Sequence, residues 1–449
     1  YLNDRPVSLR GSSYIPALYL SQCTDESFTH DLALARAANL NLLRVHVHVS
    51  PLELYDLCDR TGLLIWQDFE LNWTQDTSPE FEQRALRLQR DMIDLLKHHP
   101  SVVMWACHNE PTMIFARRSN LEVRPDPALY ADAAAYDPTR PVFLCSGQMD
   151  ADWQRSGDSH WYFGAIWSRH FTDIRRRRSR LLSEFGFEAP ASRETLRDCP
   201  DVWERLNHLD DHIESLWAYQ AVLIQYQVEY VRRLRRESCA GYVHFCLNDL
   251  VPQVGCGVLD ASRLPKGGYA ALQRASQPLL ISLDHDGHRP IALWVCNDTM
   301  QAYPAVSIRW QLYSEHDALL DQGTVRFDIP ANASQPVMKT NWSVPPRQIA
   351  TVRLSILDAD GKVLSENNYD RPFARWERPR GYPWKFDPYL GTKVFDRPDA
   401  PSLADHGVSP LMRLIPLPLR EAAAEWALRG NWPVRFQSMI ARIADRLLD

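Results

Sequence analysis

From residue 1 to about residue 280, short apolar runs alternate with longer amphipathic stretches. The apolar runs predict eight strands, at Val7–Ile15, Asn41–Val49, Leu63–Asp68, Val102–His108, Val142–Ser146, His160–Ile166, Arg180–Phe185 and Gly241–Leu247. Between them, apolar residues recur every three or four positions, which predicts helices at Phe28–Ala38, Leu52–Arg60, Pro79–His98 and Asp211–Arg236. Strands that alternate with helices form parallel sheets, and eight such units in this length fit a (β/α)8 TIM barrel.

Beyond residue 280 the pattern changes to an alternation of apolar and polar residues with a period of two. The runs are separated by turns and not by helices, which is typical of an immunoglobulin-like β-sandwich; they lie at Ile291–Asn297, Ala305–Tyr313, Gly323–Ile329, Arg347–Leu357 and Lys362–Asn367. From Arg371 the chain is rich in proline and aromatic residues, and it ends in an amphipathic run at Arg420–Leu447 that predicts a helix. The sequence therefore predicts an α/β barrel at 1–280, a β-sandwich at 281–370 and a C-terminal extension at 371–449.

Composition excludes several classes of protein. With 45% hydrophobic and 24% charged residues the chain can bury a large core, which excludes a disordered or fibrous protein. The net charge of −6 is spread along the chain and offers no basic face, so we expect no nucleic-acid partner. No run approaches the roughly 20 apolar residues of a membrane span, so we expect no membrane partner. The nine cysteines stand singly, which predicts buried thiols and neither disulfides nor a zinc site.

Two glutamates follow predicted strands of the barrel. Glu110 comes with Asn109 directly after the fourth strand, and Glu184 lies at the end of the seventh. Because the carboxyl ends of all barrel strands meet at one rim, these two carboxylates should face each other at about 5 Å, the separation used by retaining glycosidases. The alternative is that each glutamate caps a helix or makes a surface ion pair.

The second strand contains the run LLRVHVHV, in which Arg44, His46 and His48 should share one face. Polar side chains that point into a barrel need partners, because burying them unpaired costs several kcal/mol, so we expect all three to line the site. The alternative is a metal-dependent hydrolase in which His46 and His48 bind a divalent ion with Asp249. That alternative leaves the paired glutamates unexplained.

Other strand ends carry aromatic and hydrogen-bonding side chains together, a combination suited to sugar recognition. Excess tryptophan (15 residues) is compatible either with a thick aromatic core or with platforms for sugar rings. The candidate residues for substrate binding at these strand ends are Trp66, Asp68, Trp73, His160, Trp161, Tyr162, Asn248 and Asp249.

The same segments resemble glycoside hydrolase family 2, in its β-mannosidase and exo-β-glucosaminidase-like branch. The resemblance covers most of the predicted barrel and rests on the runs NLLRVHVHVSPLELYDLCDRTGLLIWQDFEL, HHPSVVMWACHNEP, GDSHWYF, LLSEFGF and LNDLVPQVGCGVLDASRLPKGGYAAL. It implies that Glu110 is the acid/base, Glu184 the nucleophile, and Asn109 the partner of the sugar's 2-substituent. It also implies that Arg44 holds the nucleophile in its ionised form.

The resemblance further implies a carbohydrate substrate and a retaining exo-β-glycosidase, with a β-mannoside as the favoured substrate. We expect no cofactor and no catalytic metal, since the His46/His48 pair departs from the pattern of the β-galactosidase branch. Family members carry two domains before the barrel, which we expect on a part of the chain outside these residues or on a separate polypeptide. Phe245 replaces a tryptophan common in the eighth strand of the family, and Leu250 replaces an aromatic residue expected after the aspartate, which should alter the choice of sugar. The competing class is a non-catalytic carbohydrate-binding or scaffold protein on a barrel that has lost activity.

Overall fold

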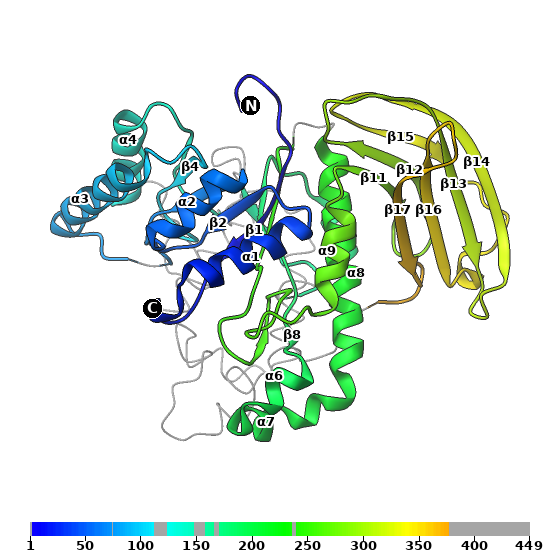
Figure 1. The fold of residues 1–449 in the computed structure, drawn as a ribbon, viewed down its shortest axis with the longest axis horizontal. Helices are drawn as coiled ribbons and strands as arrows, with labels where there is room; N and C mark the ends of the chain where they lie inside the picture. The colour runs from blue at the N-terminus through cyan, green and yellow to red at the C-terminus, as the bar shows by residue number, and fades with distance from the viewer. Residues whose placement is uncertain are drawn as a thin grey trace, which may run out of the picture.

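The computed structural model describes residues 2–73, 75–111, 124–147, 158–165, 170–235 and 239–376. Figure 1 shows a parallel sheet surrounded by helices beside a sandwich of antiparallel strands, with the long helix α8 (Ile213–Leu234) between them. The predicted fold class, a barrel followed by a β-sandwich, is confirmed. The division at residues 280 and 370 stays a prediction, and the helix expected at Arg420–Leu447 lies outside the described residues.

Eight strands form the parallel sheet, and each lies within or beside a predicted run. They are β1 (Leu9–Tyr14), β2 (Leu42–Val45), β3 (Leu64–Asp68), β4 (Val102–Ala106), β5 (Val142–Phe143), β6 (Ser159–His160), β7 (Leu182–Glu184) and β9 (Gly241–His244). Their order is β5-β4-β3-β2-β1-β9-β7-β6 and every pair is parallel, so their carboxyl ends share one rim. Within the described residues no backbone ladder joins β5 to β6, the two shortest of these strands.

Because side chains alternate along each strand, the sheet has an inner face and an outer face. Leu42 and Trp66 share the inner face with Arg44 and Asp68, two residues further along β2 and β3. The inner apolar cluster consists of Leu42, Trp66, Met104, Ala106, Leu181 and Val243. A much larger cluster lies between the outer face and the helices. We call this inner cluster the apolar floor of the barrel. The polar side chains of Arg44 and Asp68 lie between it and the carboxyl ends of the strands.

Helices cover the outer face of the sheet, and all four that the periodicity predicts are present. These are α1 (Asp25–Ala37), α2 (Leu52–Thr61), α3 (Pro79–Leu96) and α8. Local chemistry sets their ends: Ser78 accepts a hydrogen bond from the N–H of Phe81 at the start of α3, and Gly62 ends α2 with a φ of +73°. The other helices within the described residues are α4 (Asp126–Tyr136), α6 (Arg193–Arg197), α7 (Pro200–Leu206) and α9 (Gly267–Ala275), with 3-10 turns η1 (Leu20–Gln22), η2 (Phe171–Arg176) and η3 (Asn207–His212).

A short antiparallel pair, β8 (Ala189–Pro190) with β10 (Val254–Gly255), ties together the loops that follow β7 and β9. The loop after β9 therefore turns back over the sheet before α9 begins. The path of this loop sets the direction of the side chains that follow β9, the eighth strand of the barrel.

The sandwich contains two antiparallel sheets, β11-β12-β15 and β14-β13-β16-β17. Its strands are β11 (Leu279–His285), β12 (Pro290–Asn297), β13 (Tyr303–Tyr313), β14 (Leu319–Ile329), β15 (Ala333–Lys339), β16 (Thr351–Leu357) and β17 (Val363–Asp370), with a 3-10 turn η5 (Pro346–Gln348) before β16. The five predicted strands are present. β11 escaped prediction because it is buried on both faces and shows no alternation, and β15 because Pro336 interrupts a weakly apolar run.

A buried polar network joins α8 to the sandwich. Asn367 Nδ2 and the hydroxyl of Tyr369, both on β17, donate to the two carboxylate oxygens of Glu229 at 2.8 and 2.7 Å. The backbone N–H of Leu283 on β11 donates to the Tyr369 oxygen at 2.7 Å. Since buried polar atoms are costly unless paired, these bonds hold the sandwich to the barrel in one orientation.

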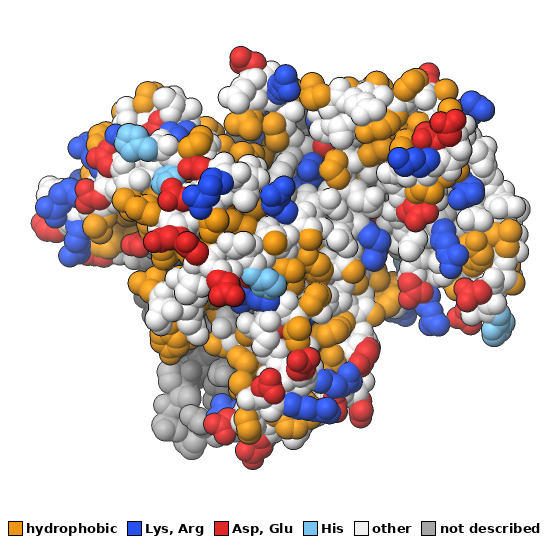
Figure 2. Space-filling model, viewed as in Figure 1, with side chains coloured by type: hydrophobic (Ala, Val, Ile, Leu, Met, Phe, Trp, Pro, Cys, Tyr) orange, Lys and Arg blue, Asp and Glu red, His pale blue; other side chains and the backbone are white. Residues whose placement is uncertain are grey.

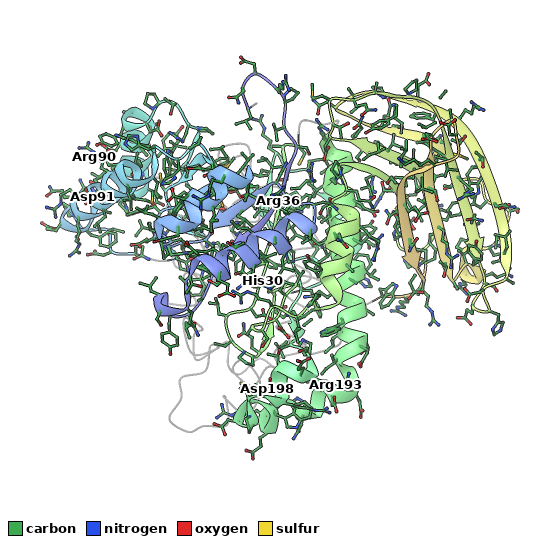
Figure 3. All side chains as sticks on the ribbon, in the orientation of Figure 1. His30, Arg36, Arg90, Asp91, Arg193 and Asp198 are labelled. Atoms are coloured by element: carbon green, nitrogen blue, oxygen red, sulfur yellow. The ribbon has the colours of Figure 1, made fainter. Side chains whose placement is uncertain are left out.

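The surface carries mixed charge. Acidic and basic side chains are interspersed on the face in Figure 2, and exposed residues such as Arg36 on α1 and Arg90 on α3 project from the outer helices in Figure 3. In the described part of the chain, no helix has the length and apolar character needed to cross a membrane. All nine cysteines are free thiols.

Glu229→Ala should lower the free energy of unfolding by about 3 kcal/mol, because Asn367 and Tyr369 lose their buried acceptor. Urea denaturation measures the change. The matched control is Glu366→Ala, at an exposed position of β17, the strand that carries Asn367 and Tyr369. It should change the free energy of unfolding by no more than about 0.5 kcal/mol. Equal effects of the two substitutions would contradict the role given to this network.

Candidate active site

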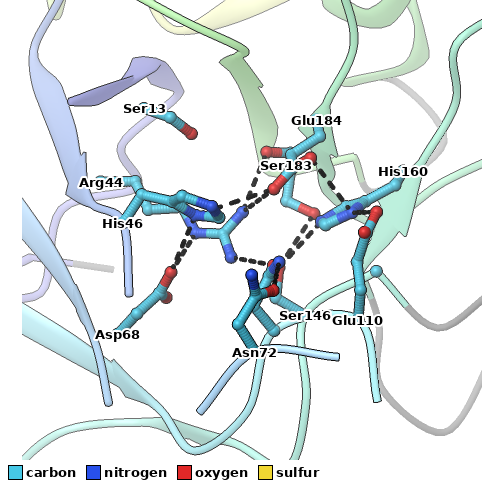
Figure 4. A network of polar contacts seen from close by, with 12 residues as sticks. Ser13, Arg44, His46, Asp68, Asn72, Glu110, Ser146, His160, Ser183 and Glu184 are labelled. Carbon is cyan, nitrogen blue, oxygen red and sulfur yellow. Dashed lines mark hydrogen bonds and ion pairs between the residues drawn. The ribbon is translucent and has the colours of Figure 1, made fainter. Parts of the chain in front are cut away.

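The carboxyl ends of the parallel strands bring a cluster of candidate residues together (Figure 4). Arg44 belongs to β2, His160 to β6 and Glu184 to β7, while Asn109 and Glu110 directly follow β4. The side chains of Arg44, His160 and Glu184 are all buried. The site is therefore built from strands far apart in the sequence and adjacent at one rim.

Arg44 is the hub of the cluster. Its guanidinium donates from Nε to Asp68 Oδ2 at 2.8 Å, from Nη1 to Glu184 Oε1 at 2.9 Å and from Nη2 to Asn109 Oδ1 at 2.6 Å. The Trp66 ring lies 4.9 Å from the guanidinium carbon. Burial acts to lower the pKa of Arg44, but the charges of Asp68 and Glu184 outweigh it and the pKa is raised. The donors of the guanidinium point in fixed directions, so Arg44 holds the side chains of its three partners in place.

The two glutamates approach each other across His160. One oxygen of each carboxylate and one ring nitrogen of His160 lie within 4.8 Å of one another. His160 Nδ1 is 2.7 Å from Glu110 Oε1 and 3.4 Å from Glu184 Oε2. The Tyr162 hydroxyl donates to Glu184 Oε2 at 2.8 Å, and Trp73 Nε1 donates to Glu110 Oε2 at 3.1 Å. Both carboxylates are thus held in fixed orientations.

Glu110 and His160 form an ion pair whose members stabilise each other's charge. Burial acts to raise the pKa of Glu110, but the hydrogen bond and charge of His160 outweigh it and the pKa is lowered. Burial acts to lower the pKa of His160, but the charges of Glu184, Glu110 and Asp158 outweigh it and the pKa is raised. The lowered pKa of Glu110 and the raised pKa of His160 each favour the charged form of that group.

The expected alignment of Arg44, His46 and His48 on one strand face is wrong. β2 ends at Val45, and Val47 has a φ of +52°, so the alternation stops before His48. Both ring nitrogens of His48 are bound within its own loop, to the His46 carbonyl at 2.9 Å and the Ser50 hydroxyl at 2.8 Å. His46 remains beside the cluster, with Nδ1 3.4 Å from Asp68 Oδ2 and its ring edge-on to Phe245.

Trp66, Asp68 and Trp161 are buried and engaged in contacts within the protein. Trp66 is fully buried and stacks on Phe143 at 5.0 Å, and Asp68 is occupied with Arg44. Trp161 belongs to the large apolar core, near Phe163. Buried side chains of this kind support the residues above them, so their predicted substrate contacts are corrected to packing and to the orientation of Arg44.

Asn248 and Asp249 organise the loop after β9. Asn248 Nδ2 donates to the Ile15 carbonyl at 3.0 Å, and Asp249 pairs with Lys266 Nζ at 2.7 Å, both partners being buried. Asp249 also accepts from the N–H of Gly257 at 2.9 Å. These bonds direct Asp249 toward the returning loop, whereas Asn248 bonds to the residue that follows β1.

Several residues of the site were not predicted from the sequence, namely Asn72, Ser146, Asp158 and Ser183. Asn109 Nδ2 donates to Asn72 Oδ1 at 2.9 Å, and Ser146 Oγ is 3.0 Å from His160 Nε2. The Ser183 hydroxyl donates to Asp158. Tyr162 was predicted as a substrate-binding candidate, and its hydrogen bond to Glu184 was not predicted. The signal that could have found these small polar residues is their position at or directly beside strand ends, the criterion that identified Glu110 and Glu184.

Two groups of described residues bring three carboxylate or imidazole ligand atoms within 4.8 Å: Asp56, Asp59 and His99, and Glu110, His160 and Glu184. In the second group His160 Nδ1 is hydrogen-bonded to Glu110, so we assign it as an ion pair. The alternative site of His46, His48 and Asp249 fails on geometry, because His48 and Asp249 are each bound to other protein groups.

Comparison with known proteins matches both parts of the chain. A family model described as "Glycosyl hydrolases family 2, TIM barrel domain" matches residues 2–280, and one described as "Mannosidase Ig/CBM-like domain" matches residues 289–370. A β-mannosidase of Rattus norvegicus is 28% identical over 229 residues, covering 44% of this chain and 25% of that protein. β-Mannosidase B of Thermothelomyces thermophilus is 21% identical over 469 residues, covering 85% of this chain and 54% of that protein.

A solved structure shares the fold. It is described as a β-D-mannosidase from Dictyoglomus thermophilum and aligns with a TM-score of 0.70 at 22% identity, over 84% of this chain and 52% of that one. The chain spans between a quarter and about half of the length of these curated relatives.

Stability should depend on pH through the Glu110–His160 pair. Since the folded pKa of Glu110 is lowered, its contribution is present above about pH 4.3 and is lost as the pH falls through the folded value. Since the folded pKa of His160 is raised, its contribution is present below about pH 6.5 and is lost as the pH rises through the folded value.

His160→Gln should therefore lower the free energy of unfolding most between about pH 4.3 and 6.5, and less on either side. Urea denaturation of both proteins at a series of pH values measures this difference. A difference that stays constant from about pH 3 to about pH 9 would show that no ion pair exists.

Proposed function

Because this chain belongs to glycosyl hydrolase family 2, we propose that it is a glycoside hydrolase that removes terminal β-linked sugars with retention of configuration. In this proposal Glu184 attacks the anomeric carbon, and Glu110 protonates the departing oxygen and then deprotonates the attacking water. The chain holds both groups at the carboxyl ends of its barrel strands.

The single observation that carries the proposal is the approach of the two carboxylates. Oxygens of Glu110 and Glu184 lie within 4.8 Å of each other. Retaining glycosidases hold their two carboxyl groups about 5 Å apart, because the nucleophile must touch the sugar ring itself. Inverting enzymes need a wider gap of roughly 6.5 Å or more, which leaves room for a water molecule.

The surroundings of Glu184 suit a nucleophile. Arg44 donates to one of its oxygens at 2.9 Å and Tyr162 to the other at 2.8 Å. These donors fix the plane of the carboxylate and compensate its charge in a buried place. The bonds must loosen as the ester forms, and they re-form when the carboxylate is released.

The surroundings of Glu110 suit a group that alternates between acid and base. One oxygen contacts His160, and the other accepts from the half-exposed Trp73. Glu110 must carry a proton when the glycosidic bond breaks, although the ion pair with His160 keeps it ionised in the free protein. When Glu184 becomes a neutral ester, Glu110 acts as the base for water.

We propose a β-mannoside or a related hexoside as substrate. The proposal draws on the β-mannosidases among the relatives and on the match to a mannosidase immunoglobulin-like domain. Asn109, which is fixed by Arg44 and Asn72, is proposed to contact the 2-substituent of the sugar. Phe245, edge-on to His46, takes the place of the tryptophan found in the family and should influence which sugar fits.

Glu184→Ala should lower kcat by on the order of 10⁵-fold, because the covalent step is lost. Glu110→Ala should lower kcat by about 10² to 10⁴-fold for substrates with poor leaving groups and much less for activated aryl glycosides, which need no acid. Steady-state kinetics with both substrate types checks these values. Glu53→Ala, on the exposed surface of α2, is the control and should leave kcat unchanged.

A panel of 2-fluoro glycosides identifies the sugar in the same proteins. We expect one sugar to label Glu184 covalently in the wild type, read by mass spectrometry of the peptide that contains it. Normal turnover by Glu184→Ala would refute the mechanism. Absence of labelling by every sugar would favour the competing class, a non-catalytic carbohydrate-binding protein.

A further inference from the structure

The barrel is joined between β5 and β6 by side chains. The N–H of Gly147 donates to Asp158 Oδ1 at 3.1 Å, and Ser146 Oγ lies 3.0 Å from His160 Nε2. Only glycine fits at position 147, where φ is +77° and a Cβ atom would lie 2.2 Å from His160 Nδ1. We define the seam as Ser146, Gly147, Asp158 and His160. Two of these residues also touch the candidate acid/base: His160 Nδ1 lies 2.7 Å from Glu110 Oε1, and the Ser146 carbonyl accepts from the N–H of Glu110 at 2.8 Å.

The contacts of both ring nitrogens favour a doubly protonated His160. Nδ1 faces two carboxylates, Glu110 at 2.7 Å and Glu184 at 3.4 Å, and so must carry a hydrogen. On the other side, the Ser146 hydroxyl donates to Ser183 Oγ at 3.5 Å, and the Ser183 hydroxyl donates to Asp158. With its own hydrogen directed to Ser183, Ser146 accepts from Nε2. In that arrangement both ring nitrogens donate, which is the hydrogen-bond pattern of an imidazolium.

Charge balance supports the same state. Among the described residues, the three carboxylates of Asp68, Glu110 and Glu184 contact the Arg44 guanidinium or the His160 ring, so they outnumber the one guanidinium described there. Such an excess of negative charge is costly in a buried place unless further positive charge is present. Glu184 from β7, Glu110 from the residues after β4 and Asp158 before β6 are the charged groups that act most strongly on the ring.

We propose that His160 stores, between turnovers, the proton that Glu110 delivers to the leaving oxygen. This inference rests on the proposed function and deepens it. His160 acts through Glu110 as a positioning residue, and the serines and Asp158 hold the ring and its second hydrogen in place. The site thereby keeps one exchangeable proton on the Glu110–His160 pair.

The proton balance over one turnover is closed. In the first step the Nδ1–H bond breaks with its electron pair left on nitrogen, and the proton passes through the Glu110 carboxyl to the glycosidic oxygen. Glu184 bonds to the anomeric carbon while the glycosidic C–O bond breaks with its electron pair left on that oxygen, which departs as the alcohol. In the second step water gives a proton to Glu110 and attacks that carbon. The ester bond breaks with its electron pair left on Glu184, and the proton returns from Glu110 to His160.

The charge of Glu184 controls the direction of transfer. While Glu184 is a carboxylate, its oxygen 3.4 Å from Nδ1 stabilises the imidazolium. Esterification removes that charge at the moment when the proton has been consumed, so neutral His160 is favoured. Hydrolysis restores the carboxylate, and with it the preference of His160 for the proton.

Nitrogen-15 NMR of the labelled full chain tests the proposal, with His160→Gln assigning the resonances. In the free protein at pH 7 we expect both His160 nitrogens to be protonated, and in the 2-fluoro glycosyl adduct at pH 7 we expect Nδ1 to have lost its hydrogen. A neutral His160 in the free protein, or an imidazolium that persists in the adduct, would overturn the proposal. If no sugar forms an adduct, the proposed function fails, while the free protein still decides the state of His160.

Variants separate this role from a purely structural one. Asp158→Asn should lower the midpoint of His160 titration by about one pH unit, because a nearby negative charge is removed. Ser183→Ala breaks the same chain of hydrogen bonds and should lower the midpoint even if Asp158→Asn does not fold. The control is Asp260→Asn, which alters another fully buried aspartate bound to backbone N–H groups and should leave the midpoint in place. Equal midpoints in Asp158→Asn, Ser183→Ala and wild type would refute the link.

Discussion

The buried guanidinium of Arg44 is the interaction on which the rest of the site depends. Removing a full charge from water is costly, and the cost is offset here by three hydrogen bonds to Asp68, Asn109 and Glu184, which come from three different strands or strand ends. Because the guanidinium is planar and its donors point in fixed directions, it sets the relative positions of its partners. A lysine offers a single point charge and could not hold this arrangement.

The same arrangement explains why an apolar floor lies under a charged cluster. Trp66 packs against Phe143 on one side and faces the guanidinium on the other, so the inner apolar cluster ends where the charged network begins. Water is thereby kept from the lower side of Arg44, which strengthens its bonds to the carboxylates above. Fold stability and site geometry rest on the same few side chains.

The sequence allows much of the fold to be predicted, because strand-forming runs and helical periodicity are local properties. It also places Arg44, Asn109, Glu110 and Glu184 at strand ends, since parallel strands bring their carboxyl ends to one rim. The errors arise where chain geometry departs from a regular strand. β2 stops before His48, and the loop after β9 turns back and takes Asp249 to Lys266. The pairing of His160 with Glu110 lies beside the seam next to β5. It was not predicted, because the local sequence does not indicate that β5 is only a short strand.

The most direct measurement of the central claim is the anomeric configuration of the first sugar released. The claim is that the Arg44 network holds Glu184 within reach of the sugar ring, with an oxygen of Glu110 no more than 4.8 Å away. Proton NMR of the wild-type reaction, recorded before mutarotation, should show the β-anomer as the initial product of a β-glycoside. An initial α-anomer would mean that water attacks directly, and it would contradict the account.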